Sequence, residues 1–220
     1  YGWRTVAADL ALAYRDIAAR SGRPAPVSNM WGGEAMVRPM ATGAGRPRRI
    51  LYCHNNYTTR GGETDTFETE VAGLREAGHE VLVYERQSVE FEEAGIAGRV
   101  GFAASMPWSL RTARDLATAV ARFKPDVAIV QNVFPLITPA AFSALHRAGV
   151  PVIYACYNYR LVCPSAYLFT EGAICERCVT GHSFHAVRHR CIKDSATISL
   201  AYATTLEIHR RLGTFVRNID

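Results

Sequence analysis

Four cysteines in the C-terminal third of the chain are spaced like the ligands of one metal ion. Cys175 and Cys178 form a Cys-x2-Cys pair, and Cys163 and Cys191 flank it at similar distances. This pattern suits a tetrahedral structural Zn²⁺ held by four thiolates. Such a site can organise a loop that has little core of its own, because metal binding there is folding energy. Four thiolates leave no coordination position open, so we expect no catalytic metal.

Two disulfides are the alternative interpretation of these cysteines, although the sequence carries no export signal. His182, His185 and His189 lie close enough in the sequence to replace one thiolate. Cys53 and Cys156 fall at the ends of expected strands instead. We interpret them as small buried apolar residues.

A second candidate site is the polar segment 54–63, which ends in Gly61-Gly62 directly before an expected helix. Two glycines let the backbone approach a ligand closely, and a helix N-terminus offers unpaired N–H groups to an anion such as a diphosphate. Asn55, in the same segment, is a candidate substrate ligand. A tight turn that merely needs glycine is the alternative.

A third candidate is the segment 157–160, at the carboxyl end of the fourth expected strand. Asn158 and the guanidinium of Arg160 could hold a phosphate or a sugar hydroxyl there. A polar loop without a ligand is an equally good interpretation of this segment.

These segments are positioned by alternating short apolar runs and amphipathic stretches. Strands are expected at 50–53, 81–84, 127–130 and 150–154, and helices at 63–77, 105–123, 138–149 and 195–212. Residues 86–104 show no regular pattern. The alternation predicts an α/β fold, a Rossmann-like parallel sheet with flanking helices, and a cysteine-rich loop inserted at 160–192. Ligands in such sheets bind beyond the carboxyl ends of the strands, where the two polar segments fall.

The N-terminal part has a different character. Residues 1–20 predict a short amphipathic helix, and residues 21–47 a linker rich in proline and glycine, so the main domain is expected over 48–220. The chain starts at Tyr1 without an initiator Met, and we interpret it as a fragment.

Composition supports a folded domain. The 220 residues are 49% hydrophobic and 20% charged, and no apolar run is long enough to cross a bilayer. The net charge is +5, with the excess late in the chain, at Arg188, Arg190, Lys193, Arg210, Arg211 and Arg217. This excess suits a phosphate-bearing ligand or an anionic membrane surface. It is less dense than the basic face of most nucleic-acid binders, so we expect no nucleic-acid partner.

Several segments together resemble the N-terminal domain of glycosyltransferase family 4. The segments are Arg49-Ile-Leu-Tyr-Cys-His-Asn, Arg60-Gly-Gly-Glu, Gly78-His-Glu-Val, Phe123-Lys-Pro-Asp-Val, Asn132-Val-Phe-Pro-Leu, Asn158-Tyr-Arg-Leu-Val-Cys-Pro and the stretch from Cys175 to Cys191. The likeness runs from about residue 48 to residue 220. Residues 1–20 separately resemble the closing helix of such an enzyme.

The resemblance implies a GT-B fold, in which two Rossmann-like domains face each other across a cleft. It implies transfer of a sugar, with retention, from a nucleotide-sugar to a glycan or lipid-linked acceptor. The first domain would receive the acceptor, and Gly61 and Gly62 would meet the donor diphosphate. The C-terminal donor-binding domain would be missing from this chain. By the same resemblance the enzyme would be cytoplasmic, with peripheral contact at the inner face of the cell membrane.

Two positions depart from the family pattern. Tyr157 stands where the resemblance places a catalytic histidine near the donor sugar, and Gln131 where a histidine often precedes the Asn. A tyrosine can donate a hydrogen bond but is no cation near neutral pH.

Three other functions are compatible with parts of the sequence. A nicotinamide dehydrogenase domain would use Glu85 as its ribose-binding acid, but Gly61-Gly62 is not a G-x-G-x-x-G loop. A zinc-stabilised interaction module without catalysis would explain the cysteines but not the strand–helix repeats. An inactive orphan fragment is the third alternative.

Overall fold

The computed structural model describes residues 47–220. The helix expected over 1–20 and, apart from residue 47, the linker expected over 21–47 lie outside the described residues. The main sheet has four parallel strands in the order β2-β1-β3-β4. Their bounds are Arg49–Asn56 for β1, Glu80–Gln87 for β2, Val127–Val130 for β3 and Val152–Tyr154 for β4.

The central strand β1 fixes the register of the sheet. Ile50 is paired with Val81 of β2 on one side and with Val127 of β3 on the other. Residues 50–56 of β1 are all buried, because helices cover both faces of the sheet. Such a strand appears in sequence as a continuous apolar run, which is how the β1 and β3 segments were predicted.

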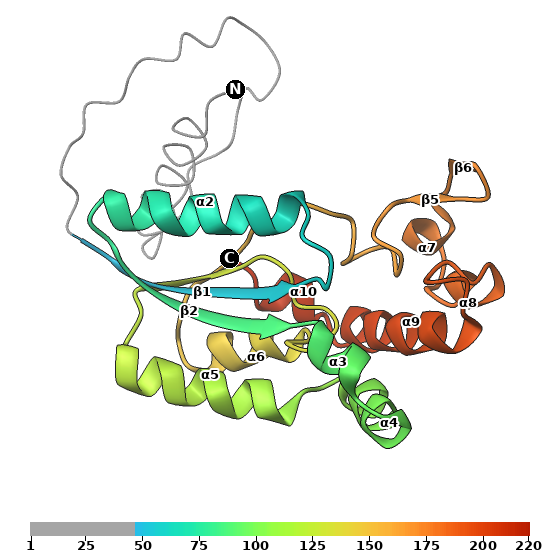
Figure 1. The fold of residues 1–220 in the computed structure, drawn as a ribbon. Coiled ribbons are helices and arrows are strands. Elements are labelled where there is room, and N and C mark those ends of the chain that lie inside the picture. The colour runs from blue at the N-terminus through green and yellow to red at the C-terminus, as the bar shows by residue number, and fades with distance from the viewer. Residues whose placement is uncertain (1–46) are drawn as a thin grey trace, which may run out of the picture.

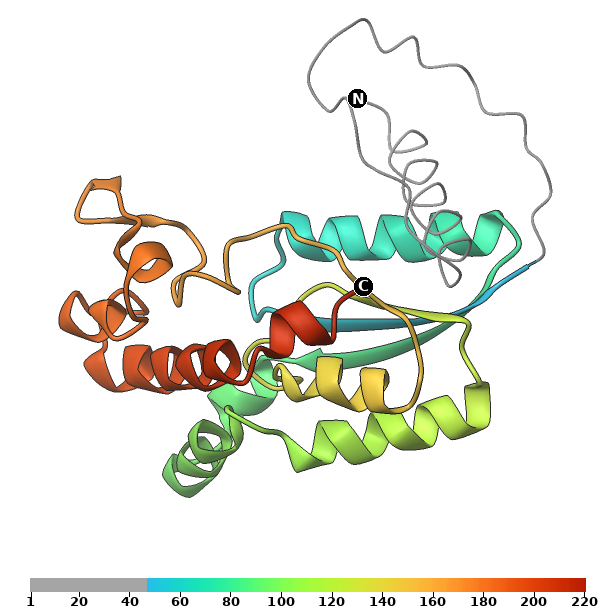
Figure 2. The same cartoon turned by 180° about the vertical axis from the view of Figure 1, so that it is seen from behind.

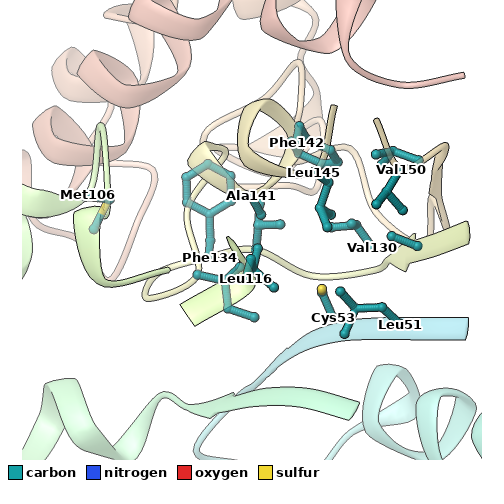
Figure 3. Close-up of a cluster of buried hydrophobic side chains, with 14 of the residues drawn as sticks. Leu51, Cys53, Met106, Leu116, Val130, Phe134, Ala141, Phe142, Leu145 and Val150 are labelled. Atoms are coloured by element: carbon teal, nitrogen blue, oxygen red, sulfur yellow. The ribbon is translucent and has the colours of Figure 1, made fainter. Parts of the chain in front are cut away.

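Helices form a layer on each face of the sheet (Figure 1). Helix α2, Gly62–Glu76, covers one face, and helices α5, Leu110–Phe123, and α6, Ala140–Arg147, cover the other. Alternate side chains of β1 serve the two layers: Tyr52 packs with Phe67 of α2, and Leu51 with Leu116 of α5. Figure 3 shows the larger cluster, on the α5 and α6 side.

The prediction for residues 86–104 was wrong, because two short helices occupy this segment. They are α3, Val89–Glu93, and α4, Ile96–Ser105. Arg86, near the end of β2, forms a 2.7 Å ion pair with Glu90 of α3, and Phe91 of α3 packs against Phe102 of α4 with ring centroids 6.0 Å apart. Helices this short carry too few apolar positions to display a helical period.

The predicted start of the next helix was also wrong. Helix α5 begins at Leu110 rather than at residue 105, because Ser109 provides the N-cap: its hydroxyl accepts a 3.2 Å hydrogen bond from the Thr112 amide. The helix ends as predicted, where Lys124 adopts the left-handed conformation at φ 49°.

A lobe built from the predicted cysteine-rich loop, residues 160–192, projects from the end of the sheet toward which the strand arrows point (Figures 1 and 2). It holds the hairpin β5, Phe169–Thr170, and β6, Ala173–Ile174, and the one-turn helices α7, Arg177–Thr180, and α8, His185–Arg188. We call residues 160–192 the cysteine lobe. Helix α9, Ala196–Arg211, begins at the cap residue Ser195 and is followed by α10, Thr214–Arg217.

The predicted fold class is therefore confirmed: the domain is α/β, with a four-strand parallel sheet flanked by helices, like half of a GT-B fold. None of the helices in the described range is both long and apolar enough to cross a membrane.

Candidate functional site

The polar segments predicted to bind ligand meet beyond the carboxyl ends of the strands. Asn158, after β4, donates a 2.6 Å hydrogen bond to the Glu63 carboxylate in the first turn of α2. Gln131, after β3, donates from its side-chain amide to the Glu63 carbonyl at 3.0 Å. Glu63 thus ties three neighbouring segments of this edge together, as the topology of the sheet predicts.

The glycine pair lies at the N-terminus of α2. Gly61 is the N-cap, in extended conformation with φ −147°, and its carbonyl accepts hydrogen bonds from the amides of Thr64 and Asp65. The amides of Gly62 and Glu63 have no hydrogen-bond partner among the described residues. A Cβ added to either glycine would meet no atom within 4 Å. The alternative of a turn that needs glycine is therefore not supported, since neither backbone strain nor crowding requires it here.

Arg60 places a cation beside this helix terminus. Its guanidinium forms ion pairs with Glu68 at 2.5 Å and with Asp65 at 2.8 Å, and its side chain is 62% exposed. Both partners lie on α2, so the pairs hold the glycine loop against its own helix. Exposed ion pairs of this kind contribute little to stability and can be exchanged for a ligand anion.

Tyr157, where the resemblance predicts a catalytic histidine, is held by a buried carboxylate. Its hydroxyl donates a short hydrogen bond to Glu70 of α2, and the Tyr52 hydroxyl donates another. Glu70 is only 4% exposed. Burial, and then the contact with Glu70, raise the pKa of Tyr157 above its ordinary value, so the phenol stays neutral.

The side chain of Asn55 forms hydrogen bonds within the domain in this structure. Its side chain is completely buried, donates to the Ser88 hydroxyl at 2.8 Å and accepts from the Leu136 amide at 3.0 Å. These bonds join the end of β1 to the segments that follow β2 and β3. The predicted contact between Asn55 and substrate remains a prediction.

Arg160 is also buried. Its guanidinium donates a short hydrogen bond to the Pro164 carbonyl and lies over the ring of Tyr202, 5.1 Å from the ring centroid. The Nε atom has no hydrogen-bond partner within the part of the chain that the structure describes. Arg160 thus connects the end of β4 to the cysteine lobe and to α9. Like Asn55, it remains a predicted ligand.

Sequence reasoning missed Glu70 and gave no role to His54. Glu70 follows the apolar residue Phe67 at helical spacing, and a carboxylate on the buried stripe of a helix is the signal that could have revealed it. His54 is completely buried and stacked on Phe67, with ring centroids 4.5 Å apart. Burial lowers the pKa of His54 to about 4, so its imidazole is neutral at physiological pH.

The four clustered cysteines come together as predicted. Cys163, Cys175, Cys178 and Cys191 line one cavity of about 10 Å³ in the cysteine lobe. All four are free thiols. Of the other two cysteines, Cys53 is buried as predicted, but the prediction for Cys156 was wrong: it is exposed, in the loop after β4. Burial acts to raise the pKa of Cys163, but the Ser165 hydroxyl, 3.2 Å away, and surrounding backbone N–H groups outweigh it and lower that pKa.

The cavity brings the right donors together without forming a finished metal site. Within residues 47–220 no three His, Cys, Asp or Glu side chains stand in an arrangement that could hold an ion as they are. The chemistry of four thiols fits Zn²⁺. Zinc binding therefore remains a prediction.

The family of the chain follows from its sequence. Residues 61–218 match the glycosyl transferase 4-like domain, from the glycine loop through the cysteine lobe to α10. The chain belongs to this family. No curated protein and no solved structure gives a significant match. As a glycosyl transferase 4-like domain, the protein has sugar donors and acceptors as its general class of substrate.

Proposed function

We propose that this domain is the acceptor-side half of a retaining glycosyltransferase, and that its glycine loop receives the diphosphate of a nucleotide-sugar donor. The observation that carries the proposal is the pair of free amides at the N-terminus of α2, in a family whose members transfer sugars. Two unpaired N–H groups and the helix dipole attract an anion, and the empty space above Gly61 and Gly62 leaves room for it.

The acceptor in this proposal is a glycan or a lipid-linked sugar. It would bind beside the glycine loop, near Tyr157 and Asn158, which close the same edge of the sheet. Tyr157 is 42% exposed, so its ring can contact a ligand while its hydroxyl remains on Glu70. A neutral phenol can orient a sugar hydroxyl but supplies no positive charge to the leaving diphosphate.

Two further parts of the proposal rest on the family. Nucleotide binding and the choice of donor would belong to a second Rossmann-like domain, across the cleft from this one. Contact with the inner face of the cytoplasmic membrane would bring the domain to lipid-linked acceptors. The exposed apolar side chains of Tyr167, Phe169 and Ile174 in the cysteine lobe support that contact.

The experiment that tests this function is a transfer assay with the full-length protein. It would combine a panel of radiolabelled UDP-, GDP- and dTDP-sugars with lipid-linked and soluble glycan acceptors. Transfer from one donor to an acceptor, with the anomeric configuration of the product determined by NMR, is the expected result. Failure of every donor to bind or react would support a non-catalytic interaction module instead.

A further inference from the structure

The cysteine lobe has no core of large apolar side chains. Its buried apolar residues are all small, namely Cys163, Pro164, Ala166, Cys178 and Ala186. Its larger apolar residues include several that are exposed: Tyr159 beside it, and Tyr167, Phe169, Ile174, Val179 and Phe184 within it. A segment this short cannot order itself on so little apolar burial, and proteins supply the difference with disulfides or a metal.

The thiols occupy the place where that core would be. Cys163 follows β4, Cys175 and Cys178 flank the start of α7, and Cys191 follows α8, so three separate segments of the lobe meet at one cavity. The volume of about 10 Å³ is close to that needed by one water molecule, and a metal ion is no larger.

We propose that Cys163, Cys175, Cys178 and Cys191 together bind one structural Zn²⁺, which closes the cysteine lobe. Each ligand is a thiolate, so binding releases the thiol protons. With four sulfurs on the ion no position is left for a substrate, and the metal stabilises the lobe without taking part in sugar transfer.

A hydroxyl group lies near two of the four sulfurs. The Ser165 hydroxyl lies 3.2 Å from Cys163 Sγ, and Thr170 lies 3.8 Å from Cys191 Sγ. One exposed arginine, Arg177, lies between Cys175 and Cys178 in the sequence and forms a 3.8 Å ion pair with Glu171. Hydrogen-bond donors and cations around a metal–thiolate cluster offset its net negative charge.

The thiols must move to complete the site, since no three of these side chains among residues 47–220 are yet arranged to hold an ion. Each sulfur can turn about one staggered torsion while its backbone stays in place. The opposing interpretation is two disulfides, which would use the same four residues but bind no metal.

The test is the metal content of the full chain, purified under reducing conditions in the presence of zinc. We expect about one zinc per chain by elemental analysis, and a tetrahedral thiolate spectrum after replacement of zinc with Co²⁺. Cys175→Ser should abolish stoichiometric zinc, whereas Cys156→Ser should keep it, because Cys156 lies outside the cavity.

A second measurement, amide hydrogen exchange, uses the wild-type chain and therefore does not depend on whether the cysteine variants fold. Removal of zinc from the wild-type chain by a chelator should raise amide exchange across residues 160–192 while the sheet stays protected. Wild-type protein without zinc, or with these four cysteines joined as disulfides in non-reducing mass spectrometry, would overturn the proposal. An iron–sulfur cluster in place of zinc would also overturn it.

Discussion

At the scale of single residues, the environment of Glu70 explains how the fold holds Tyr157 at the edge of the candidate site. The carboxylate is buried and accepts hydrogen bonds from both Tyr52 and Tyr157. A buried carboxylate is stable only with such donors. Tyr157 therefore has a structural task at the edge of the site as well as any contact with substrate.

This arrangement predicts a stability cost for Tyr157→Phe. Loss of the hydroxyl leaves Glu70 with one donor fewer in a buried position, which should lower the free energy of unfolding by about 1–3 kcal/mol. Urea unfolding would measure it. The matched control is Tyr159→Phe, because the Tyr159 hydroxyl forms no hydrogen bond with another residue of the described range 47–220 and the side chain is 55% exposed. Equal stability of the two variants would contradict the role of Glu70.

His54 predicts how stability depends on pH. Burial lowers the pKa of His54 from 6.5 to about 4, so between these values the unfolded chain binds a proton that the folded chain does not. Stability should therefore fall as the pH falls through this window, by about 3 kcal/mol in total. Burial also lowers the pKa of His209, which acts in the same direction.

The measurement is the free energy of unfolding at pH 7 and at pH 4.5. His54→Leu should reduce the difference between the two values, whatever its effect on absolute stability. His146→Asn, at an exposed position on α6, should leave the difference as in the wild type. A pH difference unchanged by His54→Leu would show that another group causes it.

At the scale of elements, helix α9 is the platform on which the cysteine lobe rests. The Nε2–H of His209 donates a 2.6 Å hydrogen bond to the Pro107 carbonyl, and its Nδ1 lies 2.9 Å from the Thr214 hydroxyl, so both ring nitrogens anchor α9 to the domain. On the next residue, the Arg210 guanidinium donates to three carbonyls at the end of α7, those of Cys178, Val179 and Gly181.

Arg210→Ala should therefore loosen the lobe without unfolding the sheet. Loss of these hydrogen bonds to carbonyls should ease local opening by about 1–3 kcal/mol, seen as faster amide exchange over residues 175–191. Arg211→Ala is the control, because the Arg211 side chain is exposed and its ion pair, with Glu207, lies within the same helix. If both variants exchange alike, α9 does not anchor the lobe through Arg210.

At the scale of the whole molecule, the hairpin of β5 and β6 is the part of the cysteine lobe that we expect to contact the membrane. Phe169 and Ile174 are directly paired across it, and both side chains are exposed. Arg188 and Arg190, neither of which forms an ion pair with another described residue, flank His189, which contacts the hairpin turn at Glu171. Apolar and basic side chains together favour an anionic lipid surface.

Ile174→Glu should weaken binding to vesicles of anionic phospholipid by about tenfold or more, because it replaces an apolar contact with a repelled charge. Vesicle co-sedimentation would measure this. Val216→Glu is a matched control, since Val216 is 88% exposed and Ile174 is 83% exposed. Binding that is equally strong in both variants, or absent from the wild type, would contradict a membrane contact through the hairpin.

The sheet was predictable from the sequence because its strands are short apolar runs, each followed by a capped or glycine-ended helix. The gathering of Gly61 and Asn158 at one edge followed from parallel topology alone. The cysteine cluster followed from spacing, and the four thiols do share a cavity.

The features that the sequence did not predict depend on contacts between residues that are far apart in the chain. The residues near Glu70 in the sequence do not predict its hydrogen bond with Tyr157, 87 residues later. Likewise, the residues near Asn55 do not predict that its side chain accepts a hydrogen bond from the Leu136 amide. Helices α3 and α4 were missed because their order comes from pairs such as Phe91 with Phe102 rather than from a long apolar stripe. Tertiary packing decides such elements.

The most direct test of the central claim is sugar transfer by the full-length protein carrying Gly62→Val. The valine fills space that is empty in the fold, so the variant should keep wild-type stability and lose about tenfold or more in kcat/KM for the nucleotide-sugar donor. Gly95→Val is the control, since Gly95 caps α4 and is equally uncrowded. A Gly62→Val enzyme with the donor kinetics of the control would contradict a diphosphate site at this loop.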